Sequence, residues 1–398
     1  MIESSTENQG SDPQGPDSDS PGRDSDSPDR GSDSPDRGFG MPAVEHFRKV
    51  IEEAREAAPE GRDGLLVLTH RGPDPDAIGS CEGMRHLCET RLGLRVEVAT
   101  VGRIHRAENL ALVRALGLEF ATYDDIVPEE FFGAVLVDTQ PDFGHTFLPE
   151  DIRVLAVFDH HVPPTAGEDG DASPIPHRDV RLGIGATASI VYEYLRDAKC
   201  EWGEIVATAL FCGIRYDTAD LSRNSSALDE EAYYATFRNA DRELITQINH
   251  PPLPRVYYSE LHDALSEARQ YGALVLCLLG RVSHPEFVAE MADFFLRMNG
   301  CAWVVVGGAV EEEGQYVLSL RTDYAFGNAY PLMDRVLDGQ GSFGGHGHIA
   351  GARIPLEDMG ESSINSVERD LRRRALAILG STDEGSLPPE GRPLADST

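Results

Sequence analysis

The sequence predicts a two-domain α/β protein, in which a parallel sheet with its helices precedes a smaller mixed α/β domain across a central cleft. Three apolar runs, 65–68, 134–137 and 154–158, are each suited to a buried strand, and helical patterns lie between them. A histidine or an aspartate follows each run within two residues. Because open α/β sheets bind ligands at the carboxyl ends of their strands, we expect these polar side chains to converge there.

The composition limits the class of partner. The chain has 398 residues, 40% of them apolar, and a formal net charge of −33. That charge repels long duplex nucleic acid, which we do not expect as a partner, whereas a bound divalent metal can still attract a short anionic substrate. Six cysteines without a C-x-x-C pair indicate reduced core thiols and favour a cytoplasmic location. Since no apolar run is long enough for a membrane helix and no signal pattern is present, no membrane partner is expected. The sequence does not decide whether the protein forms a homodimer.

Residues 1–40 form a segment of unusual composition. They repeat a heptad three times, as DSDSPGR, DSDSPDR and GSDSPDR, and carry almost no apolar side chains. Such a segment cannot bury enough surface to offset its ordering entropy, so we predict a disordered acidic tail. The prolines and the lack of apolar a and d positions exclude a coiled coil. Met41 follows directly, and the sequence leaves open whether residues 1–40 are translated.

The predicted first domain covers residues 41–250 and alternates strands with helices. A helix beginning near Pro42 places Phe47 and Ile51 on its apolar face. The prolines and glycine of the loop 71–76 predict a sharp turn. A further strand is expected at 94–100, and further helices at 77–91, 109–116, 187–196 and 203–213. The stretch 161–183 is rich in Pro, Gly and acids and is predicted to be a loop.

The proline-rich stretch 251–257 predicts a hinge, followed by a second domain at 258–380 and a flexible tail at 381–398. Strands of the second domain are expected at 273–279, 301–310 and 315–321, with helices at 285–299 and 328–338. The segment 341–348, GSFGGHGH, is predicted to be a loop. Its glycines allow backbone N–H groups to approach an anion, and a simple flexible turn is the alternative.

Six imidazole or carboxylate side chains lie at or just beyond the ends of predicted elements: His70, Asp74, Asp76, Asp138, His160 and Asp217. Such a set without thiolates favours Mn²⁺ or a similar divalent ion over structural zinc. The set contains more carboxylates than a single ion would need as ligands. Two ions about 3.5–4 Å apart, bridged by a carboxylate and a water, would hold a hydroxide for in-line attack on phosphorus. The alternatives are a helix cap for Asp76 and an ordinary helix-terminal residue for Asp217.

Five sequence segments occur in a characteristic order: THRGPDPDAIGS, LVDTQP, VFDHH, GIRYDT and GGHGHIAG. Over about residues 43–356 the chain thereby resembles the DHH/DHHA1 phosphoesterases, the RecJ-like and nanoRNase-like group. The resemblance implies a DHH domain with a parallel sheet and a DHHA1 domain that holds the substrate. It also implies a hydrolase that uses manganese, with Mg²⁺ or Co²⁺ as alternatives, on short oligonucleotides (nanoRNA) or small phosphorylated nucleotides.

The resemblance implies a role for each residue. His70 and Asp74 would bind one metal, and Asp138 would bridge it to a second metal. Asp76, His160 and Asp217 would bind that second metal. Asp159 would orient the histidines, and His161 would lie near the substrate phosphate. The residues that would recognise the terminal nucleotide or phosphate are Arg321, Gly344, Gly345 and His346.

Two positions depart from the family pattern. Many nanoRNase-like members have a Phe-Arg pair after the aspartate that corresponds to Asp217, and it is open whether Arg223 replaces that arginine at the substrate. Phe343 stands where the first of three glycines is common. Because of these two changes, the resemblance does not determine which substrate the protein hydrolyses. A soluble cyclic-dinucleotide phosphodiesterase is therefore an alternative. A non-catalytic nucleotide-binding module is the alternative from another class, although all six ligand positions are filled.

Overall fold

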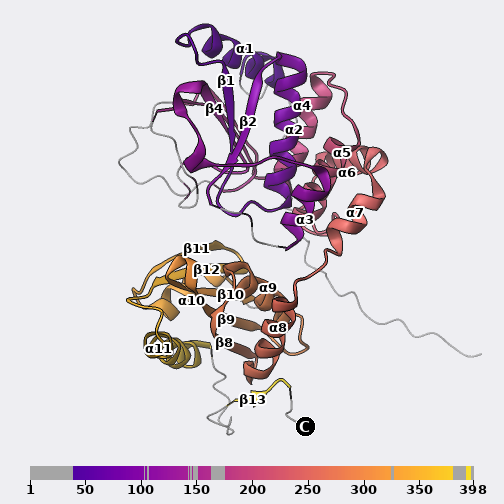
Figure 1. Cartoon of the computed structure of the whole chain (residues 1–398). Coiled ribbons are helices and arrows are strands. Elements are labelled where there is room, and N and C mark those ends of the chain that lie inside the picture. Colours follow the sequence, from indigo (N-terminus) through magenta and orange to yellow (C-terminus); the bar gives the residue numbers. More distant parts are fainter. Residues whose placement is uncertain are drawn as a thin grey trace, which may run out of the picture. The chain divides into compact units, whose positions relative to one another are not determined.

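The computed structural model describes residues 39–102, 104, 107–141, 143, 146, 151–162, 175–323, 327–379 and 391–395. Within them the chain forms two separate sheets, each with its own helices (Figure 1). The predicted acidic tail lies outside the described residues except for its last two positions. The predicted α/β class, with a parallel sheet followed by a mixed sheet, is confirmed.

The first sheet consists of six parallel strands in the order β3-β2-β1-β4-β5-β6. They are β1 (Gly64–Leu68), β2 (Arg95–Thr100), β3 (Ala121–Thr122), β4 (Phe131–Val137), β5 (Val154–Asp159) and β6 (His177–Val180). β1 and β4 are buried along their whole length, as their continuous apolar runs predict. The chain adds strands on one side of β1 and then on the other, so the order reverses between β1 and β4. Such a switch point is where open α/β sheets bind ligands.

Seven helices accompany this sheet: α1 (Ala43–Glu56), α2 (Pro75–Leu92), α3 (Ala107–Leu116), α4 (Thr187–Asp197), α5 (Glu204–Asp217), α6 (Ala227–Asn239) and α7 (Arg242–Asn249). Short 3₁₀ turns, η1 (Tyr123–Asp125) and η2 (Pro128–Glu130), precede β4. Two glycines allow α2 and α5 to pack closely. A Cβ on Gly79 would lie 2.4 Å from the carbonyl oxygen of Ala209, and one on Gly213 would lie 2.9 Å from that of Pro75. This close packing brings the last turn of α5 to the first turn of α2.

The second sheet has seven strands in the order β11-β12-β10-β9-β8-β7-β13, with β8 and β9 parallel and the other pairs antiparallel. They are β7 (Arg269–Tyr271), β8 (Leu274–Val282), β9 (Trp303–Val310), β10 (Gln315–Thr322), β11 (Ser342–His346), β12 (Ile349–Pro355) and β13 (Arg392–Pro393). The helices are α8 (Arg255–Glu267), α9 (Pro285–Leu296), α10 (Ala329–Leu337) and α11 (Glu361–Leu379), with the 3₁₀ turn η3 (Glu311–Glu313).

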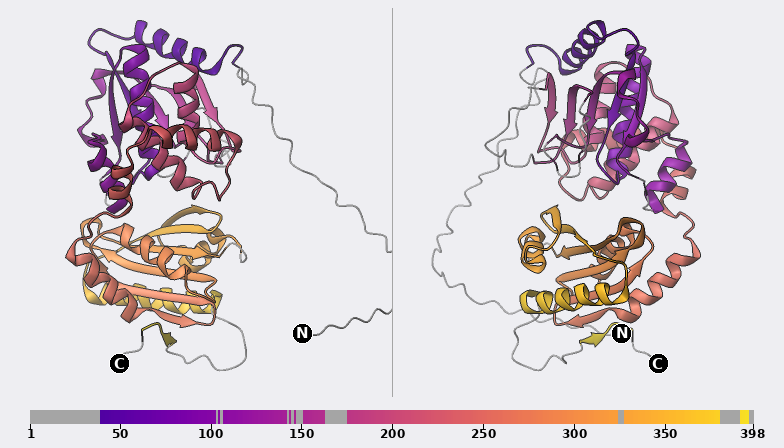
Figure 2. Two further views of the ribbon diagram at one scale, coloured as in Figure 1. Left: turned by 90° about the vertical axis from the view of Figure 1, so that its right-hand side faces the viewer. Right: turned by 60° about the vertical axis from the view of Figure 1, so that its left-hand side comes forward.

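Alternate residues of β8 point to opposite faces of the second sheet. Val275 and Cys277 pack in one core with residues of α8 and α9. Leu274 and Leu276 pack in another core with residues of α10 and α11. The helices on the two faces can be followed in Figure 2. The period of two along the strand therefore supports helical layers on both sides.

The structure differs from the sequence prediction in several segments. Residues 177–180 lie in the predicted loop but form β6, which was missed because its buried residues, His177 and Asp179, are polar. Residues 342–346, also predicted as loop, form β11, whose glycines pair through the backbone and give no side-chain alternation. Helices α8 and α11 and strands β3, β7, β12 and β13 were not predicted. α8 begins at Arg255, inside the predicted hinge.

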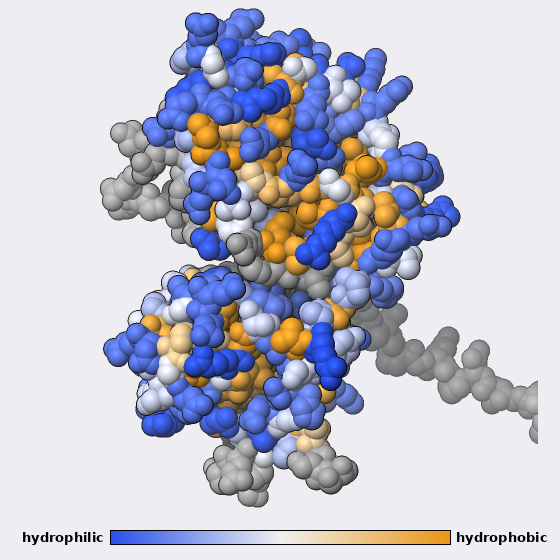
Figure 3. Space-filling model, viewed as in Figure 1, coloured by the Kyte–Doolittle hydropathy of each residue, from blue (hydrophilic) through white to orange (hydrophobic). Residues whose placement is uncertain are grey.

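The surface and the cysteines bear on the predicted setting. All six cysteines are buried and free, as predicted. None of the described helices is long and apolar enough to cross a membrane. Hydrophilic residues cover much of the face seen in Figure 3, and hydrophobic residues lie between them in several groups.

Candidate metal centre

The ends of three neighbouring strands form the base of the centre. β1, β4 and β5 are adjacent and lead to His70, Asp138 and His160. The backbone N–H of Asp138 donates to the carbonyl of Phe158 at 2.8 Å, which ties the ends of β4 and β5 together. Asp138 has a φ of 57°, in the left-handed region that non-glycine residues seldom adopt. Backbone conformations of this kind cluster at functional sites.

Helix termini supply the next two carboxylates. Asp74 caps α2, since its Oδ1 accepts from the backbone N–H groups of Asp76 and Ala77, both at 3.0 Å. Asp76 caps a different helix: its two oxygens accept from the N–H groups of Thr187 at 2.7 Å and Ala188 at 2.8 Å. The N-cap residue of α4, Ala186, has no side-chain acceptor of its own. The capping role considered for Asp76 therefore exists, but for α4 instead of α2.

All six predicted ligands converge in three overlapping groups, within each of which the ligand atoms lie within 4.8 Å of one another. The groups are His70, Asp74 and Asp138; Asp76, His160 and Asp217; and Asp138, His160 and His161. Asp138 Oδ2 lies 3.6 Å from His70 Nε2, and its Oδ1 lies 3.7 Å from His160 Nε2. The two oxygens of one buried carboxylate therefore face two different ligand sets.

The acids of this cluster repel one another. Burial, together with the charges of Asp217 and Asp138, raises the pKa of Asp74 to about 6. Burial and the charges of Asp138 and Asp217 also raise the pKa of Asp76 well above its ordinary value. A divalent cation among these carboxylates would relieve both penalties.

The pKa values of the histidines are also raised, which for an imidazole favours the charged form. Burial lowers the pKa of His70, but its contact with Asp138 and the charges of Asp74 and Asp138 outweigh burial and raise the pKa to about 9. Burial likewise opposes protonation of His160, yet its contact with Asp217 and the charges of Asp138 and Asp76 hold its pKa well above the ordinary value. For Asp138, burial opposes ionisation, but the contact with His70 and the neighbouring histidine charges lower its pKa. The negative charges of the site therefore stabilise positively charged groups within it.

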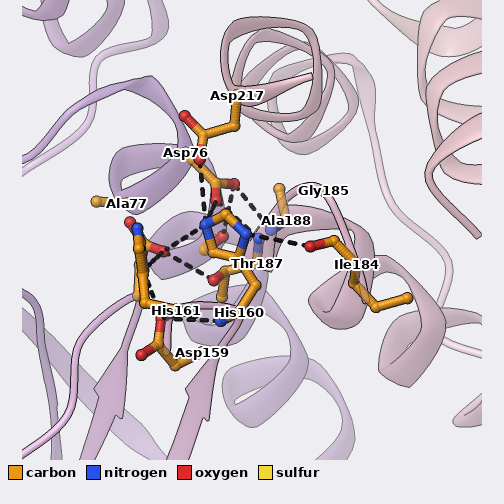
Figure 4. Close-up of polar contacts among 12 residues, drawn as sticks. Asp76, Ala77, Asp159, His160, His161, Ile184, Gly185, Thr187, Ala188 and Asp217 are labelled. Carbon is orange, nitrogen blue, oxygen red and sulfur yellow. Dashed lines mark hydrogen bonds and ion pairs between the residues drawn. The ribbon is translucent and has the colours of Figure 1, made fainter. Parts of the chain in front are cut away.

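The orientation of His160 tests whether a metal ion fits (Figure 4). Its Nδ1 donates to the carbonyl of Ile184 at 3.2 Å. Its buried Nε2 has no hydrogen bond of normal geometry among the described residues, although Asp217 Oδ2 is 3.1 Å and Asp76 Oδ2 is 3.8 Å away. An imidazole held by a carbonyl at one nitrogen, with the other facing carboxylates, is the usual arrangement of a metal ligand. The residues therefore fit a divalent ion that accepts nitrogen and oxygen ligands.

Asp159 lies behind the two histidines, fully buried. Its Oδ1 accepts from His161 Nδ1 at 2.9 Å and from the backbone N–H of His160 at 2.8 Å. Its Oδ2 accepts from the side-chain amide of Gln140 at 2.6 Å. Asp159 therefore fixes the histidine pair.

Arg223 donates through Nε at 2.9 Å and Nη2 at 2.6 Å to the backbone carbonyl of Asp217, and so holds the end of α5.

The predicted recognition residues form a separate group on the second sheet. Arg321, in β10, is 8% exposed; its Nε donates to Asp293 Oδ1 at 2.6 Å, and its Nη1 donates to Ser319 Oγ at 2.8 Å. Ile349 of β12 is the register partner of Arg321 on one side and of His346 on the other. Gly344 and Gly345 precede His346 in β11, and a Cβ on Gly344 would meet nothing within 4 Å.

Two residues at the centre were not predicted. Gln140 is fully buried and links Asp159 to the carbonyl of His161, at 3.0 Å. Thr187, also fully buried, donates from Oγ1 to Asp138 Oδ1 at 2.8 Å. Gln140 lies in the LVDTQP segment, two residues after Asp138, but its contact with Asp159 spans 19 residues and that of Thr187 with Asp138 spans 49. These contacts form only when the elements pack, so the sequence did not indicate them.

The fold and the site together define an α/β protein with a candidate divalent-metal site at the carboxyl edge of a parallel sheet. The chain is 30% identical over 345 residues to the uncharacterized protein MJ1633 of Methanocaldococcus jannaschii, and the match covers 85% of this chain and 68% of that protein. Taken with the further relatives described below, this places the chain in the DHH family of phosphoesterases. No family model matches the chain.

Two further relatives carry names of activities. The probable manganese-dependent inorganic pyrophosphatase of Lactococcus lactis is 29% identical over 159 residues, which cover 39% of this chain and 49% of that protein. The cyclic-di-AMP phosphodiesterase PdeA of Listeria monocytogenes is 24% identical over 351 residues, covering 81% of this chain and 49% of that protein. The chain therefore spans about half the length of these two relatives.

A solved structure shares the fold. The exopolyphosphatase-related protein from Bacteroides fragilis superposes with a TM-score of 0.62 at 16% sequence identity, covering 84% of this chain and 98% of that chain. This similarity extends the shared fold beyond the metal centre to most of both chains.

Proposed function

We propose that this protein is a manganese-dependent phosphoesterase that hydrolyses short oligonucleotides or small phosphorylated nucleotides with two metal ions per chain. The observation that carries the proposal is the orientation of Asp138, whose Oδ2 faces His70 and whose Oδ1 faces His160. On this proposal Asp138 would be a ligand of both ions. His70 and Asp74 would help to hold one ion, and Asp76, His160 and Asp217 would help to hold the other.

Manganese is supported by the donor set and by one relative's name. The cluster offers imidazole nitrogens and carboxylate oxygens, with no thiolate among the described ligands, and this set suits Mn²⁺. The pyrophosphatase relative is named as manganese-dependent. Magnesium and cobalt are the alternative ions.

The chain's own residues would organise the reaction around the metals. Two bound ions would supply activation of a water and neutralisation of the entering and leaving oxygens. Asp159 accepts a hydrogen bond from His161 Nδ1 and so fixes the imidazole ring of this side chain, which is 31% exposed. On this proposal His161 would donate a hydrogen bond from its other nitrogen to a phosphate oxygen. Asp159 would thereby orient this donor without contacting the substrate.

The substrate class is inferred from the second sheet and from the relatives. We assign residues 41–250 to a DHH domain and 258–380 to a DHHA1 domain, with 251–257 as a hinge. Arg321, Gly344, Gly345 and His346 would bind the terminal phosphate or nucleotide, because an arginine fork and exposed glycine backbone both suit an anion. The net charge of −33 disfavours long nucleic acids, and the sequence match with PdeA covers more of this chain than the pyrophosphatase match does.

A soluble cyclic-dinucleotide phosphodiesterase is the second candidate, because the PdeA relative is named for cyclic-di-AMP and matches 81% of this chain. The two candidates are separated by assaying the purified chain with Mn²⁺ against a linear dinucleotide, a 3′,5′-bisphosphate nucleotide, cyclic-di-AMP, inorganic pyrophosphate and a long single strand. We expect the highest kcat/KM on the linear dinucleotide or the bisphosphate nucleotide. Preference for cyclic-di-AMP would favour the second candidate, and hydrolysis of pyrophosphate alone would refute both.

A metal-free control and an Asp138→Ala control belong in the same assay. Activity that survives complete removal of divalent ions would contradict the metal-dependent proposal whatever the substrate.

A further inference from the structure

Residues 184–188, called the turn below, end the connection from β6 and include the first two residues of α4; they contact candidate ligands from two other parts of the first domain (Figure 4). The carbonyl of Ile184 accepts from His160 Nδ1 at 3.2 Å. The N–H groups of Thr187 and Ala188 donate to the two oxygens of Asp76 at 2.7 and 2.8 Å. One short backbone segment therefore fixes an imidazole from the end of β5 and a carboxylate from the start of α2.

The same turn contacts the carboxylate between the two ligand sets. Thr187 Oγ1 donates to Asp138 Oδ1 at 2.8 Å, and this is the oxygen that faces His160. Thr187 is fully buried, so water does not compete for this hydrogen bond. Because the hydroxyl sits on one side of the carboxylate, it selects one rotamer of Asp138 and keeps the other oxygen turned toward His70.

A buried acid outside the metal cluster holds the turn in place. Asp229, in the first turn of α6, accepts from the N–H of Gly185 at 2.8 Å. The same oxygen accepts from the N–H of Ser226 at 2.7 Å and from its hydroxyl at 2.6 Å. Asp229 is fully buried and belongs to none of the three ligand groups among the described residues. Its carboxylate thus connects the start of α6 to the turn.

Gly185 allows the turn to pack closely against neighbouring segments. A Cβ at this position would lie 2.8 Å from Thr218 Cγ2 and 2.9 Å from the carbonyl oxygen of Asn224. The turn is therefore packed against the segment that follows Asp217 at the end of α5, and a side chain at position 185 would push the two apart.

We propose that the turn 184–188 is a positioning element for the metal centre, in which Thr187 orients Asp138 and Asp229 anchors the turn from α6. The inference rests on the proposed function, because it assumes that Asp138, Asp76 and His160 bind metal. Residues that orient metal ligands through hydrogen bonds typically change metal affinity or activity by about 10- to 100-fold when they are removed. We expect an effect of that size from losing the Thr187 hydroxyl.

The decisive comparison is Thr187→Val against Thr187→Ser. Valine keeps the shape but removes the hydroxyl, whereas serine keeps the hydroxyl. Manganese binding is measured by titration calorimetry, and the melting temperature of each metal-free protein is measured in parallel. We expect Thr187→Val to bind Mn²⁺ about 10- to 100-fold more weakly, and Thr187→Ser to bind within a few-fold of wild type. A role in folding alone would lower the melting temperature and leave metal affinity unchanged.

Asp229→Asn tests the anchor, with Asp241→Asn as a matched control. Asp241 caps α7 by accepting from two backbone N–H groups, at 2.8 and 3.2 Å, and among the described residues its carboxylate makes no hydrogen bond to the turn. Both variants lose part of a helix cap, so both should lose some stability. Only Asp229→Asn should weaken Mn²⁺ binding and lower kcat on the preferred substrate.

The outcomes separate this inference from the proposed function. If wild type binds Mn²⁺ and hydrolyses the substrate while Thr187→Val and Asp229→Asn both match it in affinity and kcat, the positioning role is wrong and the proposed function stands. If wild type binds no divalent ion, the proposed function fails and this inference fails with it. If Thr187→Val does not fold, the Asp229→Asn comparison decides.

Discussion

Asp138 Oδ1 and His160 Nε2 lie 3.7 Å apart across the ends of β4 and β5. This separation is too long for a hydrogen bond, so the two buried groups are close neighbours without bonding to each other directly. A positive ion between them would interact favourably with both, since each has an electron pair to donate in its unprotonated form.

Removal of the shared carboxylate should abolish catalysis. We expect Asp138→Ala to lose on the order of 10³-fold in kcat/KM, because on the two-metal proposal the variant lacks a ligand of both ions and loses several kcal/mol of transition-state stabilisation. The fold should survive, since the substitution also relieves the repulsion that Asp138 exerts on Asp74 and Asp76. Turnover near that of wild type in a well-folded Asp138→Ala protein would refute the two-metal proposal.

The close contact between α2 and α5 should depend on glycine. A Cβ on Gly79 would approach the carbonyl oxygen of Ala209 to 2.4 Å, and a backbone group cannot move aside cheaply. We expect Gly79→Ala to lower the free energy of unfolding by about 1–3 kcal/mol, as overpacked substitutions do. Gly203→Ala is the control, because a Cβ there meets nothing within 4 Å. Equal denaturation midpoints for the two variants would contradict the packing argument.

The metal-free protein should become less stable as the pH rises from about 6.5 to 9. The pKa of His70 is raised from 6.5 to about 9 in the folded chain, so folding retains a proton that the unfolded chain loses first. The stability from this proton is complete below pH 6.5 and disappears as the pH passes through about 9. Melting temperatures across this range should fall for wild type and fall less for His70→Gln. An identical slope in both proteins would show that His70 is not the source.

Arg321 should affect substrate use and leave metal binding unchanged. Its guanidinium is held by Asp293 and Ser319, so it is presented in a fixed orientation. We expect Arg321→Ala to slow hydrolysis of the preferred nucleotide about tenfold or more, in line with loss of a charge-assisted hydrogen bond. Hydrolysis of a small generic phosphodiester should be little changed, because on the proposed division of roles only the nucleotide contacts Arg321.

The conservative variant Arg321→Lys provides the control for charge, since lysine retains the positive charge but not the planar fork. Equal losses on both substrates, or a smaller number of bound manganese ions in Arg321→Ala, would show that Arg321 acts on the metal centre or on the fold.

The acidic repeat should be dispensable for catalysis. Residues 1–40 have almost no apolar side chains to bury, so their removal should cost the folded part little free energy. A chain that starts at Met41 should match the full chain in melting temperature and in kcat/KM. Aggregation of the shorter chain, or a clear loss of activity, would show that the repeat contributes to folding or to the site.

The sequence by itself determined the fold class and the six candidate ligands. Long apolar runs define β1, β4 and β5, and a parallel arrangement places His70, Asp138 and His160 at one edge. The sequence did not indicate β6 or β11. Buried polar residues such as His177 are satisfied only by partners elsewhere in the chain, and Tyr194 lies 2.9 Å from its Nε2. Glycines such as Gly344 carry no side-chain pattern.

Only the tertiary structure decided how those ligands are held. Asp76 caps α4, a helix that begins 111 residues later, and the hydroxyl of Thr187 reaches Asp138 across 49 residues. Asp229 can be recognised locally as part of a capping box with Ser226, but its bond to Gly185 cannot. A sequence pattern reports what a residue does along its own helix or strand. Hydrogen bonds between elements depend on their packing, and that packing decides which oxygen of each carboxylate is left free for a metal.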